Sequence, residues 1–306
     1  MKNAINYFYN LFPDKIYKEK NHLYFFVDDT KICIYKYIRN ILEINELVKI
    51  SNELFKNNIP ISTFIVNKEN NFYFTFEEEN YVLLKINNYQ LGNVDIYDID
   101  SFNNLLISKN NDSLNNLSYN FLWSQTIDNI EERLKDFNKE YLLLQDYINY
   151  YIGLGENAII YYNNIMLENP NTKIDYRLSH RRISPKMNIE EFYNPINFIF
   201  DIEIRDLSLF VQNQVLNNEF DFDEFEKFLN SKNYNRFLIE IFYARLLYPV
   251  YYFDKVLLVI NDLAEEKVLD YYHNKAESYE IFLFEMYNLL NSKYNIPSVE
   301  WITRIE

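Results

Sequence analysis

Glycine is the residue whose scarcity most restricts the folds open to this chain. Only three glycines occur among 306 residues, at Gly92, Gly153 and Gly155. None lies in a strand, turn and helix pattern with GxGxxG or GxxxxGKS/T spacing. Backbone amides approach a phosphate closely only where side chains are absent, so the P-loop and Rossmann nucleotide sites are excluded.

The composition is that of a folded, acidic chain. Hydrophobic residues make up 48% of the sequence and charged residues 25%, which is well clear of the signature of disordered segments. A net charge of −15 repels phosphate backbones, so we expect no nucleic-acid partner. No apolar run reaches the roughly 20 residues that cross a bilayer, so no membrane span is predicted. Residues 1–13 lack the apolar core and cleavage site of a secretory signal, which predicts a cytoplasmic protein.

The sequence offers little for a disulfide or a metal site. Cys33 is the only cysteine, so it can form neither an internal disulfide nor a cysteine-based zinc site, and we expect a small buried hydrophobic residue. His22 and His273 have no histidine, cysteine or clustered carboxylates at ligand spacing, and are predicted to be ordinary histidines. No metal site is predicted.

Residues 1–89 are predicted to form a β-rich lobe. Short runs of β-branched and aromatic residues, separated by polar turns, predict strands at 22–28, 30–37, 61–66, 72–76 and 81–86. Apolar residues at helical spacing predict helices at 2–11 and 41–55. The expected arrangement is a five-stranded antiparallel sheet with one inserted helix.

Residues 90–306 are predicted to form a mainly helical lobe. Apolar residues at spacings of three and four predict helices at 101–107, 121–137, 141–165, 206–215, 221–229, 236–247, 251–263 and 265–290. Gly153 and Gly155 inside one of these patterns favour a kink or a close helix contact over a ligand loop. A polar stretch at 169–201 interrupts the helices and contains a short apolar strand at 198–200. Loops of this length inside a compact domain are often functional.

The order of these elements resembles the protein-kinase-like fold. Two strands, a helix, three strands and a helical lobe with one long polar loop are the layout of protein kinases and of aminoglycoside and choline phosphotransferases. The resemblance implies an α+β, bilobal protein. Lys36, at the end of Ile32–Lys36, resembles the lysine that holds the nucleotide phosphates, and Glu46 or Glu53 resembles its partner carboxylate. The sequence does not choose between the two glutamates.

The stretch near 175–206 resembles a degenerate catalytic loop. His180 matches the histidine of the HGD or HRD motif, but Arg182 stands where the catalytic aspartate is expected. Met187 holds the position of the following asparagine, with Asn188 one residue out of register. A guanidinium, whose pKa stays above about 12, cannot act as a base near neutral pH.

The aspartate expected to bind a metal is also isolated. Asp201, after the strand at 198–200, resembles the metal-binding aspartate but lacks its asparagine partner, and Mg²⁺ needs several oxygen ligands. No glycine occurs in residues 14–24, where a glycine-rich loop would cover the phosphates. We therefore expect no bound cofactor, since only an active enzyme would require ATP and Mg²⁺.

A closer resemblance is carried by five segments: Tyr151–Ala158, His180–Arg182, Asn194–Pro195, Arg205–Asp206 and Tyr243–Pro249. They resemble the spore-coat-associated kinase-like family of endospore-forming bacteria, the CotS and YutH group. The resemblance implies a role in spore coat assembly, in the cytoplasm of the mother cell or within the coat. It also implies other proteins, including coat components, as partners.

The only concentrated positive charge lies in the long polar stretch and leaves two interpretations open. Its members are Arg177, His180, Arg181, Arg182 and Lys186. One interpretation is that they pair with nearby acids and lock the loop. The acids are Asp175, Asp201, Glu203 and Asp206. The other is a pocket for a phosphorylated metabolite or an acidic peptide.

Three functions stay open at this point. The first is a non-catalytic, spore-coat-associated scaffold that binds other proteins. The second is an atypical small-molecule phosphotransferase that uses ATP through Lys36 and Asp201. The third is an unrelated α+β interaction protein.

Overall fold

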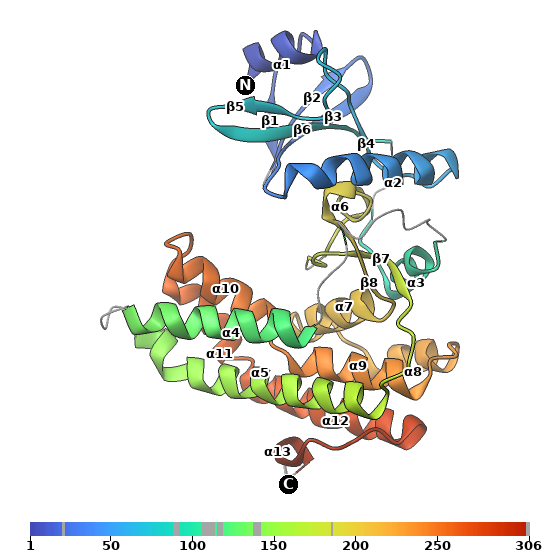
Figure 1. Ribbon diagram of the computed structural model, residues 1–306, viewed down its shortest axis with the longest axis vertical. Helices are drawn as coiled ribbons and strands as arrows, with labels where there is room; N and C mark the ends of the chain where they lie inside the picture. The colour runs from blue at the N-terminus through green and yellow to red at the C-terminus, as the bar shows by residue number, and fades with distance from the viewer. Residues whose placement is uncertain are drawn as a thin grey trace. The chain divides into compact units, whose positions relative to one another are not determined.

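The computed structural model describes residues 1–19, 22–87, 92–105, 114, 119–136, 142–184 and 186–303. The chain divides into two compact units (Figure 1). The N-terminal unit comprises Met1–Asn115, Arg177–Arg182 and Lys186–Phe200, and the helical unit comprises Asn116–Tyr176, Ile183–Pro185 and Asp201–Glu306. The units therefore do not coincide with the predicted lobes 1–89 and 90–306, whose boundary stays a prediction.

The N-terminal unit is built on an antiparallel sheet of six strands in the order β1-β2-β3-β6-β4, with β5 paired to β6. The strands are β1 Tyr17–Glu19, β2 His22–Val27, β3 Thr30–Lys36, β4 Thr63–Phe64, β5 Phe74–Phe76 and β6 Glu79–Lys85. The five predicted strands are confirmed. β1 was missed because all three of its residues are exposed, so no alternation of apolar and polar residues marks it.

The two faces of the sheet differ because side chains alternate along each strand. Ile32 and Ile34 of β3 point to one face, where they pack with Phe25 and with Ile5 of helix α1 (Lys2–Tyr9) in a hydrophobic core. Lys31, Cys33 and Tyr35 of β3, with His22 and Tyr24 of β2, point to the opposite face, which we call the second face. Cys33 is fully buried, so the second face is covered as well.

The described part of the N-terminal unit also contains five further helices and most of a pair of strands. Its helices are η1 Ile41–Glu43, α2 Ile44–Lys56, α3 Ile96–Asn103, α6 Ile189–Phe192 and η2 Pro195–Asn197. Strand β7 (Tyr176–His180) pairs with β8 (Phe198–Ile202), and Tyr176, Asp201 and Ile202 of these strands are counted with the helical unit. The predicted strand at 198–200 is therefore confirmed, whereas β7 lies where only a loop was expected, because Tyr176–His180 is mostly polar.

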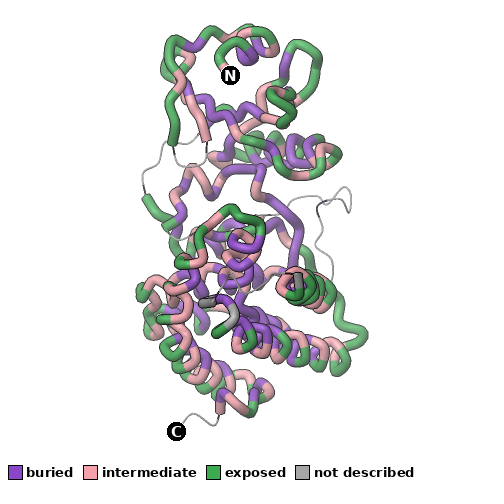
Figure 2. The backbone as a smooth tube through the Cα atoms, turned by 90° about the vertical axis from the view of Figure 1, so that its left-hand side faces the viewer, coloured by how far each residue is buried: buried purple, intermediate pink, exposed green. Residues whose placement is uncertain are grey.

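The helical unit packs its longer helices around α9 (Arg236–Leu247), which is buried on nearly all sides and contacts α5, α7 and α12. Buried and exposed stretches alternate along its helices (Figure 2). The other helices are α4 Tyr119–Asp136, α5 Leu142–Glu168, α7 Arg205–Leu216, α8 Phe222–Asn230, α10 Val250–Ile260, η3 Glu266–Leu269, α11 Asp270–His273, α12 Ala276–Tyr294 and α13 Glu300–Thr303. Among the described residues, no helix combines the length and apolar character needed to cross a membrane.

Of two predictions made for the helical unit, one is confirmed and one is wrong. Gly155 makes the predicted close helix contact, since an added Cβ would lie 3.0 Å from Ile127 and 3.1 Å from Phe253. The single helix predicted at 265–290 is wrong, because the chain there forms η3, α11 and α12. The break falls at Asn274 and Lys275; asparagine has low helix propensity, yet the apolar spacing continues across the break and gives no sign of it.

Candidate functional site

A cluster of ionisable side chains lies on the second face of the N-terminal sheet, where helix α6 meets it. The Asn188 side chain caps α6 by accepting a hydrogen bond from the Glu191 amide. Two backbone hydrogen bonds hold the start of this segment, from Val94 to Met187 and from Ile189 to Gly92. These contacts present Glu190 of α6 to strand β3.

Glu190 forms a largely buried ion pair with Lys31. The Lys31 Nζ atom donates to the two Glu190 carboxylate oxygens at 3.0 and 2.9 Å, and to Glu19 Oε2 at 3.1 Å. Only 13% of the Lys31 side chain is exposed. Burial acts to lower the pKa of Lys31, but the hydrogen bond and charge of Glu190 outweigh it, so the pKa is raised. The lysine on this face is therefore held as a cation by protein carboxylates.

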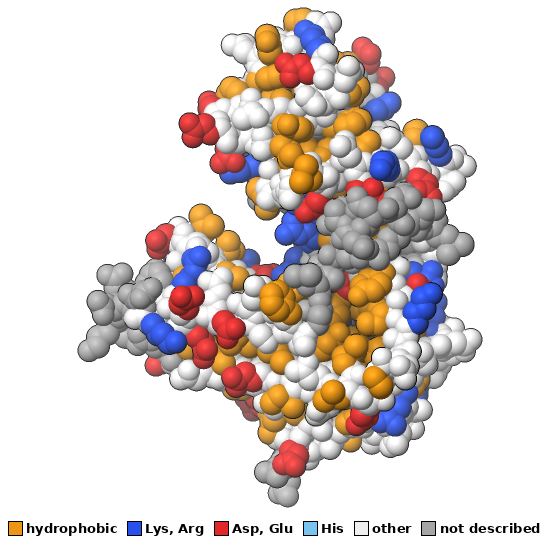
Figure 3. All heavy atoms as spheres, in the orientation of Figure 1, with side chains coloured by type: hydrophobic (Ala, Val, Ile, Leu, Met, Phe, Trp, Pro, Cys, Tyr) orange, Lys and Arg blue, Asp and Glu red, His pale blue; other side chains and the backbone are white. Residues whose placement is uncertain are grey.

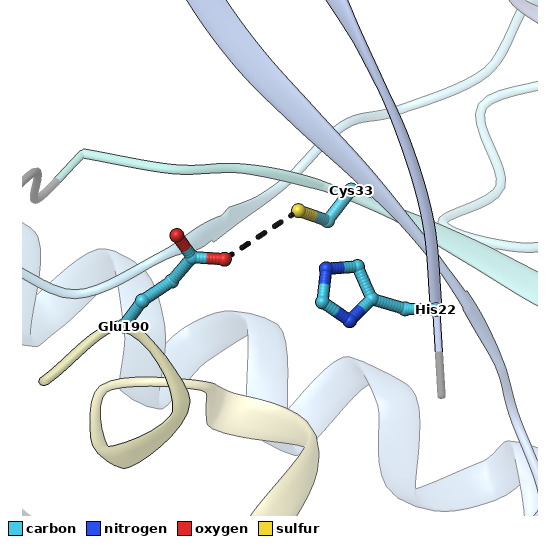
Figure 4. Close-up of side chains that lie close together, drawn as sticks. All are labelled: His22, Cys33 and Glu190. Atoms are coloured by element: carbon cyan, nitrogen blue, oxygen red, sulfur yellow. Dashed lines mark hydrogen bonds between the residues drawn. The ribbon is translucent and has the colours of Figure 1, made fainter. Parts of the chain in front are cut away.

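His22 and Cys33 lie beside the same carboxylate (Figure 4). Cys33 Sγ donates to Glu190 Oε1 at 3.7 Å, and one ligand atom from each of the three residues lies within 4.8 Å of the others. Burial and the Glu190 charge raise the pKa of Cys33 to about 12, and burial together with Lys31 lowers the pKa of His22. Near neutral pH the thiol is protonated and the imidazole is neutral.

His22, predicted to be an ordinary histidine because no cysteine or clustered carboxylates lie at ligand spacing in the sequence, has one of each beside it in space. Antiparallel pairing of β2 and β3 sets Tyr24 opposite Cys33 and places His22 diagonally across from it, on the same face. Helix α6 adds a carboxylate from 157 residues further along the chain than Cys33. Sequence spacing cannot show a contact of this kind. The burial predicted for Cys33 is confirmed.

The predicted nucleotide-binding residues are not brought together. Lys36 forms an ion pair with Glu79 at 2.8 Å, and both side chains are about half exposed. Glu46 is buried and lies 3.5 Å from Lys49, while Glu53 lies further along α2. Because side chains alternate along β3, Lys36 points to the opposite face from Lys31 and Cys33. The expected pairing of Lys36 with Glu46 or Glu53 is thus replaced by one with Glu79.

His180 and Arg182, the residues matched to the catalytic loop, lie in the N-terminal unit. His180 is fully buried; its Nε2 atom lies 2.9 Å from the Phe192 carbonyl oxygen, and its ring stacks on Phe192 at 4.4 Å between ring centres. These contacts tie the end of β7 to α6. Arg182 is exposed and donates to the Arg181 carbonyl oxygen at 2.8 Å.

Asp201 lies in the helical unit and is engaged by that unit's own residues. Its Oδ2 atom accepts a hydrogen bond from Arg205 Nη1 at 2.8 Å, and its Oδ1 atom accepts one from the Ile202 amide at 2.7 Å. The Asp201 and Arg205 side chains are only 2% and 7% exposed. Arg205 is not one of the basic residues that were expected to pair with Asp201. Both carboxylate oxygens are therefore occupied within the fold.

The helical unit also contains a tyrosine-rich pocket that is partly open to solvent. Its lining includes Tyr150, Tyr252, Tyr272, Gln212 and Lys275. The Tyr252 hydroxyl is buried and has no hydrogen-bond partner among the described residues. On the face of the molecule seen in Figure 3, acidic and basic side chains are intermixed without forming a basic stripe.

The sequence comparison decides the family. The family described as "Spore coat putative kinase YutH" matches residues 2–286. The chain belongs to the YutH family. No curated protein sequence gives a match.

Solved structures similar to this YutH-family chain are phosphotransferases and kinases. An aminoglycoside phosphotransferase from Alicyclobacillus acidocaldarius has a TM-score of 0.66 and 10% identity, covering 93% of this chain and 94% of its own. Spectinomycin phosphotransferase APH(9)-Ia has a TM-score of 0.59 and 10% identity, covering 89% and 92%. The choline kinase LicA from Streptococcus pneumoniae has a TM-score of 0.50 and 9% identity, covering 91% and 96%.

At these identities the similarity shows the fold alone. The protein-kinase-like α+β fold expected from the order of elements is confirmed, and so is the resemblance to the spore coat family. The third hypothesis, an unrelated α+β interaction protein, is thereby removed.

Proposed function

We propose that this YutH-family protein is a non-catalytic kinase-like scaffold that binds other proteins during spore coat assembly. It acts in the cytoplasm of the mother cell and becomes part of the coat. The observation that carries the proposal is the engagement of Asp201, the expected metal-binding aspartate, by Arg205.

Both oxygens of the buried Asp201 carboxylate are engaged, Oδ2 by Arg205 and Oδ1 by the Ile202 amide. Mg²⁺ binds through carboxylate oxygens in near-octahedral geometry and keeps several waters, which requires access to solvent. Asp201 is 2% exposed and is paired at 2.8 Å. Withdrawing it from Arg205 would leave a buried guanidinium without this partner, at a cost of about 3–5 kcal/mol.

The other residues matched to catalytic or phosphate-binding roles also support a non-catalytic function. Arg182 stands where the resemblance puts the catalytic base, and a guanidinium accepts no proton near neutral pH. Lys36, matched to the phosphate-binding lysine, is paired with Glu79. Lys31, which points to the second face, is neutralised by Glu190. Both lysines of strand β3 are thus already paired with carboxylates.

One observation favours a second candidate, an ATP-dependent phosphotransferase acting on a small molecule. It is the similarity of the fold to aminoglycoside phosphotransferases along almost the whole chain. In that function Lys36 would hold the phosphates and Asp201 the Mg²⁺ ion, after release from Arg205.

Titration with Mg²⁺-ATP, followed by thermal unfolding, separates the two functions. A ligand present at 100 times its dissociation constant stabilises a protein by about 2.7 kcal/mol. The scaffold function predicts no shift in unfolding temperature at millimolar Mg²⁺-ATP. A saturable shift that disappears in Lys36→Ala would refute it, because Lys36 is half exposed and its replacement leaves the fold intact.

A genetic test uses the same variant in a sporulating strain that lacks the wild-type protein. The scaffold function predicts that Lys36→Ala restores the normal protein composition of the coat, as does the control Glu79→Gln, which removes the other half of the pair. The phosphotransferase function predicts that Lys36→Ala fails while Glu79→Gln succeeds.

A further inference from the structure

On the second face of the N-terminal sheet, His22 has a buried ring nitrogen without a hydrogen-bond partner among the described residues. This nitrogen is the Nε2 atom of the ring. A buried nitrogen without a partner loses its hydration without compensation. In Figure 4 the ring edge that carries this nitrogen faces the Cys33 thiol and the Glu190 carboxylate. Three different metal-ligating groups therefore converge on one point.

The distances match those that a zinc ion requires. Zn–S bonds of about 2.3 Å and Zn–O bonds of about 2.1 Å at a tetrahedral angle place sulfur and oxygen about 3.6 Å apart. Cys33 Sγ and Glu190 Oε1 are 3.7 Å apart. All three ligand atoms lie within 4.8 Å of one another, so rotations of the side chains bring the histidine nitrogen to bonding distance.

We infer that His22, Cys33 and Glu190 form a zinc-binding site. Imidazole, thiolate and carboxylate are the ligands that Zn²⁺ takes from proteins. Binding replaces the thiol proton of Cys33, which leaves as H⁺ while the sulfur bonds to the metal. The two negative ligands then balance the charge of the ion.

Neighbouring residues complete the surroundings of the site. Lys31 Nζ donates to both Glu190 oxygens, at 3.0 Å to Oε1 and 2.9 Å to Oε2. When Oε1 bonds the metal, the hydrogen bond to Oε2 remains, as is common for metal-bound carboxylates with nearby donors. Glu19 Oε2 lies 3.8 Å from His22 Nε2 and accepts a hydrogen bond from Lys31 at 3.1 Å, so it lies beside the site without being one of its three ligands. The ion would join strands β2 and β3 to helix α6.

The site is independent of the proposed scaffold function and of ATP. It lies within the N-terminal unit and uses neither Lys36 nor Asp201. Metal binding can therefore fail while the scaffold function holds, and the reverse is equally possible.

Cobalt substitution of the intact 306-residue chain tests the site without any variant. Co²⁺ bound to a thiolate gives a near-ultraviolet charge-transfer absorption, and Cys33 is the only cysteine in the chain. We expect this absorption at one Co²⁺ per chain, and its loss when Zn²⁺ is added. Absence of the absorption at saturating Co²⁺ would overturn the inference.

Variants locate the ion through zinc titration with a competing chelator. His22→Gln and Cys33→Ser should each weaken zinc binding at least tenfold, whereas His273→Gln, which alters a histidine of the helical unit, should leave the affinity unchanged. Equal affinities in all four proteins would assign the zinc to surface carboxylates and overturn the site. Circular dichroism identifies a variant that fails to fold, and the cobalt absorption of the wild-type protein then decides alone.

Discussion

Removing the guanidinium of Arg205 is the sharpest test of the argument against metal binding at Asp201. In Arg205→Ala the Asp201 carboxylate keeps its hydrogen bond from the Ile202 amide but loses its buried ionic partner at 2.8 Å. Loss of one partner from a buried pair costs about 3–5 kcal/mol. For a unit of this size we expect the unfolding temperature to fall by about 6–20 °C.

Differential scanning calorimetry measures this change in unfolding temperature, and two further variants serve as controls. The double variant Asp201→Leu with Arg205→Met should unfold close to the wild-type temperature, because well-packed hydrophobic residues replace a buried pair at little cost. Lys267→Ala disrupts the pair of Lys267 with Glu265, which are 74% and 73% exposed, and should leave the unfolding temperature close to that of the wild type. Equal unfolding temperatures for Arg205→Ala and Lys267→Ala would refute the reasoning, since Asp201 would then not depend on Arg205.

Two further predictions concern packing and the thiol. On helix α5, Gly155→Ala should be less stable than Gly153→Ala by about 1–3 kcal/mol in urea unfolding. The reason is that a Cβ at Gly155 meets Ile127 and Phe253, while one at Gly153 meets open space. Equal stabilities of the two variants would contradict this packing. In the metal-free protein, burial raises the pKa of Cys33 to about 12, so alkylation at pH ~8 should be about 10³-fold slower than in the urea-unfolded chain. The folded state binds the thiol proton of Cys33 more tightly than the unfolded state does. The free energy of unfolding should therefore fall as pH rises above about 8.5. Cys33→Ala should remove this part of the pH dependence.

Much of the fold could be predicted because local patterns and tertiary contacts agree. Strand β3 alternates apolar and polar residues, and the turn at Asp28 adopts a positive φ of 51° as a polar turn residue can. Where the local pattern is weak, the prediction was wrong or incomplete. β1 is exposed and depends on contacts such as Tyr17 stacking on Tyr24 at 5.1 Å between ring centres.

The candidate site could be predicted less well, for two physical reasons. Motif matching selected Lys36 from strand β3, although side-chain alternation sends it to the opposite face from Lys31 and Cys33. The partner of Lys31 and Cys33 is Glu190, which no local pattern relates to β3. Alternation along the strand was a usable signal, whereas the contact with α6 required the three-dimensional structure.

The bond between Lys31 and Glu190 spans 159 positions of the chain, and this has a consequence for how the protein is made. The sheet emerges from the ribosome long before the short helix that covers its second face. Until that helix is synthesised, Lys31 and Cys33 stay open to water and the N-terminal unit lacks part of its core. Contacts between residues so distant in sequence form late and slowly. The early sheet therefore passes through a stage in which its uncovered face is open to other chains and to chaperones.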